Sequence, residues 1–133
     1  MILGVGVDIV DLQRFIRTIE RTPKVIERLF TPGERENAVA SLAGRFAAKE
    51  ALIKAFGGSG AMTWHDIEVI TNDVGAPSFV LTGAAGVMVA ARGIESVHLS
   101  ISHDGNAAVA FVVAEGRVGS HAGAHAVDQG VTA

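Results

Sequence analysis

The sequence predicts an α+β fold in which a mainly antiparallel sheet packs on one long helix. Three observations favour it: residues 2–10 alternate with the two-residue period of a strand, residues 45–56 have helical spacing, and Asp104-Gly105 separates two apolar stretches as a tight hairpin does. The order strand, helices, hairpin, helix, hairpin is typical of α+β domains.

The first strand has two different faces. One face carries Val5, Val7 and Ile9, and the other carries Gly4, Gly6 and Asp8. We expect the two glycines to leave empty space beside Asp8.

Two helical segments follow the strand. The first has Asp11 as its N-cap and ends near Pro23, where a short second turn begins. Thr31-Pro32-Gly33-Glu34 matches a capping box, so we predict a helix start at Thr31. This long helix continues, with a break near Ser41, until Gly57-Gly58-Ser59-Gly60 stops it.

The second half contains two hairpins and one helix. We predict strands at 66–71 and 78–82, a helix at 83–92, and strands at 96–102 and 107–114. Residues 1–115 form one domain, and residues 116–133, rich in Gly, Ala and His, are predicted to be a disordered tail.

Composition excludes several classes of function. The net charge of −3 argues against a general nucleic-acid binder, and the absence of cysteine excludes disulfides and thiolate chemistry. No apolar run approaches the roughly 20 residues that cross a bilayer. We therefore expect a cytoplasmic protein that spans no membrane.

Asp8 is the first candidate for chemistry. An ionised carboxylate within an apolar strand is costly unless it is paired or binds a metal ion. The alternative is an aspartate at a strand end that accepts backbone amides.

The long helix supplies more charged candidates. Lys49 falls within its apolar stripe and Glu50 lies at the border, one turn before Lys54. An ordinary Glu50–Lys54 pair explains two of these charges but not Lys49. With Asp8, and with the turn at Gly57, whose amides can face an anion, they predict a divalent-metal and phosphate site.

Two further groups of residues are candidates. Arg14, Arg17 and Arg21 share one face of the first helix, which is either a solvated face or a surface that captures an acidic helix. His103 lies where a strand enters a tight turn, which suits either a ligand contact or the turn itself.

Two motifs, Gly4-Val5-Gly6-Val7-Asp8 and the run from Arg45 through Phe46-Ala47-Ala48-Lys49-Glu50 to Ala55, resemble the holo-acyl-carrier-protein synthase family of phosphopantetheinyl transferases. The resemblance extends from Met1 to about Glu115. The segment between Glu34 and Leu42 looks shorter than is common in that family, and the tail has no counterpart there.

The resemblance implies transfer of 4′-phosphopantetheine from coenzyme A to a serine of an acyl carrier protein, for fatty acid biosynthesis. Asp8 and Glu50 would bind Mg²⁺ and, with Lys54, would be catalytic. Arg45, Lys49, Lys54, Gly57 and His103 would form the coenzyme A site, and Arg14, Arg17 and Arg21 would bind the carrier protein. The family also implies a homotrimer with sites at subunit interfaces.

Two other functions stay open at this point. The chain is alternatively a non-catalytic module whose basic helix docks an acidic partner, with the charged residues as structural ion pairs. If it is a transferase, its substrate is either a free carrier protein or a carrier domain of a large synthase.

Overall fold

A computed structural model of the chain describes residues 1–117. The predicted tail lies almost entirely outside these described residues. The chain order is β1 (Ile2–Asp11), α1 (Leu12–Arg21), α2 (Val25–Leu29), α3 (Val39–Ala55), a 3₁₀ turn η1 (Trp64–Asp66), β2 (Ile67–Thr71), β3 (Pro77–Leu81), α4 (Gly83–Ala91), β4 (Ile94–Asp104) and β5 (Ala107–Gly116). The predicted α+β class is confirmed.

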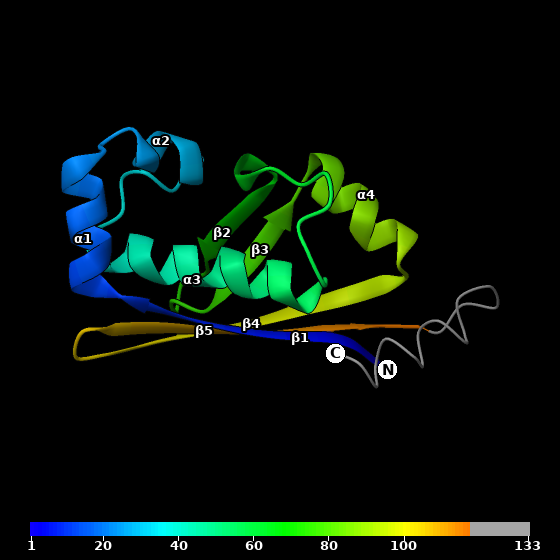
Figure 1. Ribbon diagram of the computed structural model, residues 1–133. Helices are drawn as coiled ribbons and strands as arrows, with labels where there is room; N and C mark the ends of the chain where they lie inside the picture. The colour runs from blue at the N-terminus through cyan, green and yellow to red at the C-terminus, as the bar shows by residue number, and fades with distance from the viewer. Residues whose placement is uncertain (118–133) are drawn as a thin grey trace.

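The main sheet has three antiparallel strands in the order β1-β5-β4. Figure 1 shows this sheet as the lower layer, with α3 lying along its upper face. The start of β1 and the end of β5 lie side by side, and the amino group of Met1 donates to the carbonyl of Gly116. β5 therefore extends one residue past the predicted domain boundary at 115.

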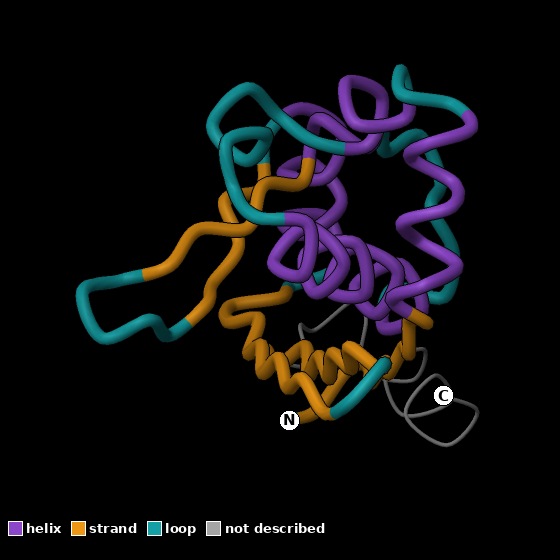
Figure 2. The backbone as a smooth tube through the Cα atoms, turned by 90° about the vertical axis from the view of Figure 1, so that its left-hand side faces the viewer, coloured by secondary structure: helices purple, strands orange, loops and turns teal. Residues whose placement is uncertain are grey.

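Strands β2 and β3 form a separate two-stranded antiparallel sheet. Figure 2 shows the turn of this hairpin extending away from the body of the molecule. In the described part of the chain, no helix is long and apolar enough to cross a membrane.

The predicted helix start at Thr31 is wrong, because only half of the capping box forms. Glu34 does reach back and accepts from the Thr31 amide (2.9 Å), but the Thr31 hydroxyl donates to Glu68 at 2.5 Å. Residues 32–36 therefore make turns, and α3 begins at Val39 after an extended Ala38. The predicted break near Ser41 is also wrong, because α3 is continuous from Val39 to Ala55.

The expected empty space beside Asp8 is also wrong, because helix α3 fills it. A methyl group added to Gly4 would lie 2.0 Å from the carbonyl oxygen of Ala55, and one added to Gly6 would lie 1.9 Å from that of Ala51. The glycines thus let the backbones of β1 and α3 touch. We call this contact between Gly4, Gly6, Ala51 and Ala55 the glycine seam.

Candidate active site

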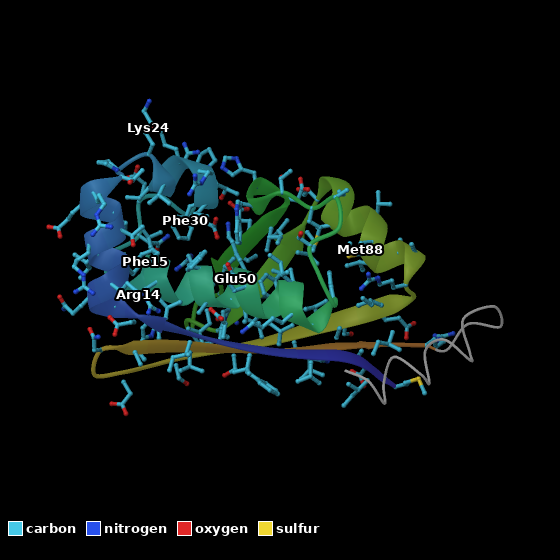
Figure 3. All side chains as sticks on the ribbon, viewed as in Figure 1. Arg14, Phe15, Lys24, Phe30, Glu50 and Met88 are labelled. Carbon is cyan, nitrogen blue, oxygen red and sulfur yellow. The ribbon has the colours of Figure 1, made fainter. Side chains whose placement is uncertain are left out.

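A cavity of about 550 Å³ lies between α1, α2, α3 and the end of β1. We call it the cleft. Asp8 and Glu50 line it together, with Arg14 on α1 and Arg28 on α2. Its apolar lining consists of Ile9, Val10, Phe15, Val25, Leu29, Phe46 and Trp64. Figure 3 shows Arg14, Phe15 and Glu50 on the elements that surround this space.

The two carboxylates reach the cleft because the glycine seam holds their elements together. Asp8 follows Gly4 and Gly6 on the inner face of β1, and Glu50 lies next to Ala51 on α3. Two residues of different elements, 42 positions apart in the sequence, thereby line one wall. The structure brings together the pair that the sequence singled out.

Lys54 interacts with Asp8 rather than with Glu50. Its ammonium donates to Oδ1 of Asp8 at 3.1 Å and to the carbonyl of Val7 at 3.0 Å. The side chain of Lys54 is 55% exposed and that of Asp8 is 18% exposed, so the pair stands in contact with solvent. The ordinary Glu50–Lys54 pair considered from the sequence is not formed among the described residues.

Partial burial raises the pKa of Glu50, and the neighbouring charge of Asp8 raises it further, while Lys54 opposes the shift. A carboxyl group whose ionisation is opposed by burial and by a neighbouring carboxylate favours a bound cation. Within residues 1–117 no group of three or more His, Asp or Glu side chains gathers as a metal site. Mg²⁺, however, is commonly held by one or two carboxylates together with phosphates and water, so this donor set fits it.

Lys49 points to the other side of α3, into the interior. Its side chain is 0% exposed, and its ammonium donates to Oε1 of Glu34 and to the carbonyl of Leu29, both at 2.7 Å, and to that of Trp64 at 3.3 Å. Burial lowers the pKa of Lys49, and Glu34 opposes this shift. The structure therefore does not bring Lys49 to the surface that Asp8 and Glu50 share.

His103 lies on β4, the edge strand opposite the β1 strand of Asp8, and Arg45 lies on α3 next to Gly44. Nε2 of His103 on β4 donates to the carbonyl of Ala40 at 3.0 Å and packs against Gly44. Arg45 is 8% exposed and donates to the hydroxyl of Ser41 through one terminal nitrogen. Among the described residues its buried Nε has no hydrogen-bond partner, which is rare for a buried donor.

The Gly57 turn closes α3. Gly57 has φ of 76°, a conformation that side chains disfavour, and its amide donates to the carbonyl of Lys54. The amide of Gly58 donates to the carbonyl of Ile53. The predicted helix end is confirmed, and both amides serve that end in this structure.

The predicted row of arginines forms on α1. Asp11 caps this helix by accepting from the amide of Arg14, as predicted, and Phe15 is buried against Phe46. Arg14, Arg17 and Arg21 are exposed, and Arg14 also lines the cleft. Their role in binding a partner stays a prediction.

The family model of the 4′-phosphopantetheinyl transferase superfamily matches residues 4–112. The chain belongs to this superfamily. The match includes most of β1 and the whole of α3, so the cleft and both of its carboxylates lie within it.

The chain matches named relatives in the superfamily over nearly the whole length of each relative. The chain is 55% identical over 116 residues to the holo-[acyl-carrier-protein] synthase of Clavibacter michiganensis, which spans 87% of this chain and 98% of that one. The crystal structure of the enzyme of that name from Neisseria meningitidis is similar with a TM-score of 0.81 and 38% identity, over 86% and 99% of the two chains. The enzyme from Bacillus anthracis, solved in complex with CoA (3′,5′-ADP), is similar with a TM-score of 0.73 and 36% identity, over 88% and 99%.

Sequence reasoning missed three residues of the site. Arg28 lines the cleft from α2, Trp64 lines it from η1, and Glu34 anchors Lys49 beneath it. Only Glu34 gave a signal, through its capping-box spacing with Thr31, and that signal was assigned to a helix start. Arg28 and Trp64 lie in segments with no motif of their own.

Proposed function

We propose that the chain transfers 4′-phosphopantetheine from coenzyme A to a serine of apo acyl carrier protein, leaving adenosine 3′,5′-bisphosphate. The observation that carries the proposal is the meeting of Asp8 and Glu50 at one cleft, with Lys54 paired to Asp8, in a member of this superfamily. The names of the relatives support the carrier protein as acceptor, and the complex of the Bacillus anthracis enzyme supports coenzyme A as donor. A cytoplasmic reaction in fatty acid biosynthesis is part of the proposal.

The reaction breaks the bond between the β-phosphate and the bisphosphate leaving group while the serine oxygen bonds to that phosphate. Lys54 is half exposed and stands beside Asp8, where its ammonium can bind phosphate oxygens and offset their charge. Asp8 in turn holds Lys54 in place. Mg²⁺ held by Asp8 and Glu50 would neutralise charge on the pyrophosphate.

We further propose that one site is built from two subunits. Arg45 and Lys54 are nine residues apart on α3, which at about 100° per residue puts them on opposite sides of the helix. Asp8 lies on one edge strand, β1, and His103 on the other, β4. The two halves of the expected coenzyme A site therefore face away from each other within one chain, and a neighbouring copy would bring them together.

The outer face of the sheet supports such an assembly. Val5, Val7 and Ile9 on β1 are 40%, 51% and 64% exposed, and Phe111 on β5, opposite Val7, is 46% exposed. Figure 1 shows no described helix over this lower face. A contiguous apolar face of this kind is typical of subunit contacts, and we propose the homotrimer that the resemblance implied.

Carrier docking is the remaining part of the proposal. Arg14, Arg17 and Arg21 offer positive charge beside the cleft, and Arg28 adds to it from α2. An acidic helix bound there would be steered by charge and held next to Glu50. Arg45, Lys54 and His103 keep their proposed contacts with coenzyme A, and the turn at Gly57 lies one turn past Lys54.

Intact-mass spectrometry of apo carrier protein incubated with the chain, coenzyme A and Mg²⁺ tests the transfer. A gain of one phosphopantetheine, abolished by a chelator, is expected with either a free carrier protein or a carrier domain of a synthase. No gain with either, from folded protein, would favour the non-catalytic docking module.

Complementation tests whether the site is shared. Asp8→Ala and His103→Ala proteins are each expected to be inactive, and their co-expressed mixture should regain activity at about a quarter of the sites. A mixture as inactive as its parts would contradict a shared site.

A further inference from the structure

The buried Lys49–Glu34 pair ties together four segments of the chain. The Lys49 ammonium donates to the carbonyls of Leu29 and Trp64 and to the carboxylate of Glu34. Glu34, 1% exposed, also accepts from the amides of Thr31 (2.9 Å) and Val69 (2.8 Å). The end of α2, the 31–36 turns, η1 and β2 are thus joined to α3 at one point.

This point lies directly behind the cleft. Leu29 and Trp64, whose carbonyls accept from Lys49, are both cleft-lining residues. They belong to α2 and η1, two neighbouring parts of the cleft wall that are also joined by the His65 ring, which donates to the carbonyl of Glu27 at 2.6 Å. The ring of Phe30, next to Leu29, covers the Lys49 ammonium, whose nitrogen lies 5.2 Å from the ring centroid. Lys49 itself does not line the cleft, and it precedes Glu50, which does.

We propose that Lys49 is a positioning residue, which with Glu34 fixes the places of α2 and η1 in the cleft wall relative to Glu50. The proposal rests on the transfer reaction proposed above and replaces direct binding of coenzyme A by Lys49. Its consequence concerns the carrier protein: α2 carries Arg28, so the place of α2 relative to Glu50 sets where a docked carrier presents its serine.

The three donors explain why the residue is a lysine. The two carbonyls and one carboxylate oxygen meet an ammonium, which has three rotatable N–H groups and no acceptor. A neutral side chain of similar length would leave the carbonyls of Leu29 and Trp64 without this donor, and α2 and η1 would lose their hydrogen bonds to α3 at this point.

A double variant, Glu34→Gln/Lys49→Met, tests the proposal without leaving an unpaired charge in the interior. Trp64 is the only tryptophan of the chain, so its fluorescence reports directly on η1. We expect stronger acrylamide quenching and a red-shifted emission. The matched control is Val112→Ala, a fully buried change in β5 that does not line the cleft.

Steady-state kinetics then separates positioning from general stability. At a temperature where circular dichroism shows both variants folded, the double variant should lose roughly tenfold or more in kcat/KM for carrier protein, since small displacements cost rate steeply. Its KM for coenzyme A should stay within about twofold. Val112→Ala should change neither value nor the quenching.

Wild-type kinetics and quenching from the folded double variant would overturn the proposal, as would an equal loss in Val112→Ala. If the double variant does not fold, Lys49→Arg takes its place, because its longer planar head group keeps the charge but must displace Leu29 or Trp64. Unchanged kinetics and quenching in folded Lys49→Arg would overturn it equally. An inactive wild type would instead refute the transfer reaction, while the fluorescence comparison would still decide whether Lys49 holds this part of the cleft wall.

Discussion

Helix α3 carries two lysines that each pair with a carboxylate in opposite surroundings. Lys49 and Glu34 are 2.7 Å apart with side chains 0% and 1% exposed. Lys54 and Asp8 are 3.1 Å apart with side chains 55% and 18% exposed. The first pair is enclosed by protein, and the second remains open to a ligand.

The difference shows that burial, rather than residue type, decides what an ion pair does. All three donors of Lys49 are used inside the protein, so this residue can contribute only to architecture. Lys54 is held loosely in contact with water, where a pair adds little stability. It remains available to bind an anion.

The strongest test of the exposed pair removes its carboxylate. Asp8→Ala should lower transfer activity by about 10³-fold or more, because the proposed cation ligand and the partner of Lys54 are lost together. Its unfolding free energy should change by less than about 1 kcal/mol. Intact-mass assays and urea unfolding measure the two effects, and an active Asp8→Ala protein would refute the role of this carboxylate.

The enclosed pair should behave in the opposite way. Lys49→Met leaves the buried carboxyl of Glu34 without its ion-pair partner and should cost about 3–5 kcal/mol of unfolding free energy. Lys54→Met, the matched change on the same helix, should cost less than about 1 kcal/mol. Urea unfolding at equal protein concentration compares them, and similar losses would remove the distinction between the two pairs.

Exposed cations on α1 extend the comparison to the proposed partner. Arg14→Glu/Arg17→Glu should raise the KM for carrier protein about tenfold and weaken its dependence on salt, with little change in stability. Arg117→Glu, on a side chain 86% exposed beyond β5, is the matched control and should leave the KM unchanged. Equal effects of the two would indicate general attraction rather than docking on α1.

The smallest expected effect concerns Glu50 in metal-free protein. Its pKa is raised in the folded state, so between the ordinary value of 4.5 and the raised pKa the folded protein binds more protons than the unfolded chain. Stability therefore falls as pH rises through this window, and Glu50→Gln should have a higher Tm than wild type at pH 7. The difference should shrink as pH falls and vanish below about 4.5.

Thermal unfolding in the presence of a chelator measures this difference. Glu20→Gln, on an exposed residue of α1, serves as the control and should follow the wild type at every pH. A lower Tm for Glu50→Gln at pH 7 would show that the carboxylate stabilises the apo fold.

Local patterns predicted most elements of the fold. Alternation predicted β1, helical spacing predicted α1 and the core of α3, and Asp104-Gly105 predicted the β4–β5 hairpin. The start of α3 was missed because the Thr31 hydroxyl donates to Glu68, which is 37 residues away. A motif of four residues holds no information about such a partner.

The candidate site was predictable in part. The sequence showed a charged Lys49 within an apolar helix stripe. It did not show the partner, because Glu34 lies 15 residues earlier, in a segment that was predicted to be helical. The contact of β1 with α3 was equally hidden, so the glycines were taken to border empty space. In contrast, the sequence alone could have shown that Arg45 and Lys54 lie on opposite sides of the helix, because a separation of nine residues is about half a turn away on a helical wheel.

The glycine seam has a consequence for the spacing of Asp8 and Glu50. The backbones of β1 and α3 touch directly at the glycine seam, with no side chain between them. The spacing therefore cannot be tuned by lengthening or shortening a side chain. Replacing Gly6 by alanine would push the whole helix away from the strand. A designer who wants a wider pair of carboxylates, for a larger cation, would have to move α3 as a rigid rod and rebuild everything packed behind it.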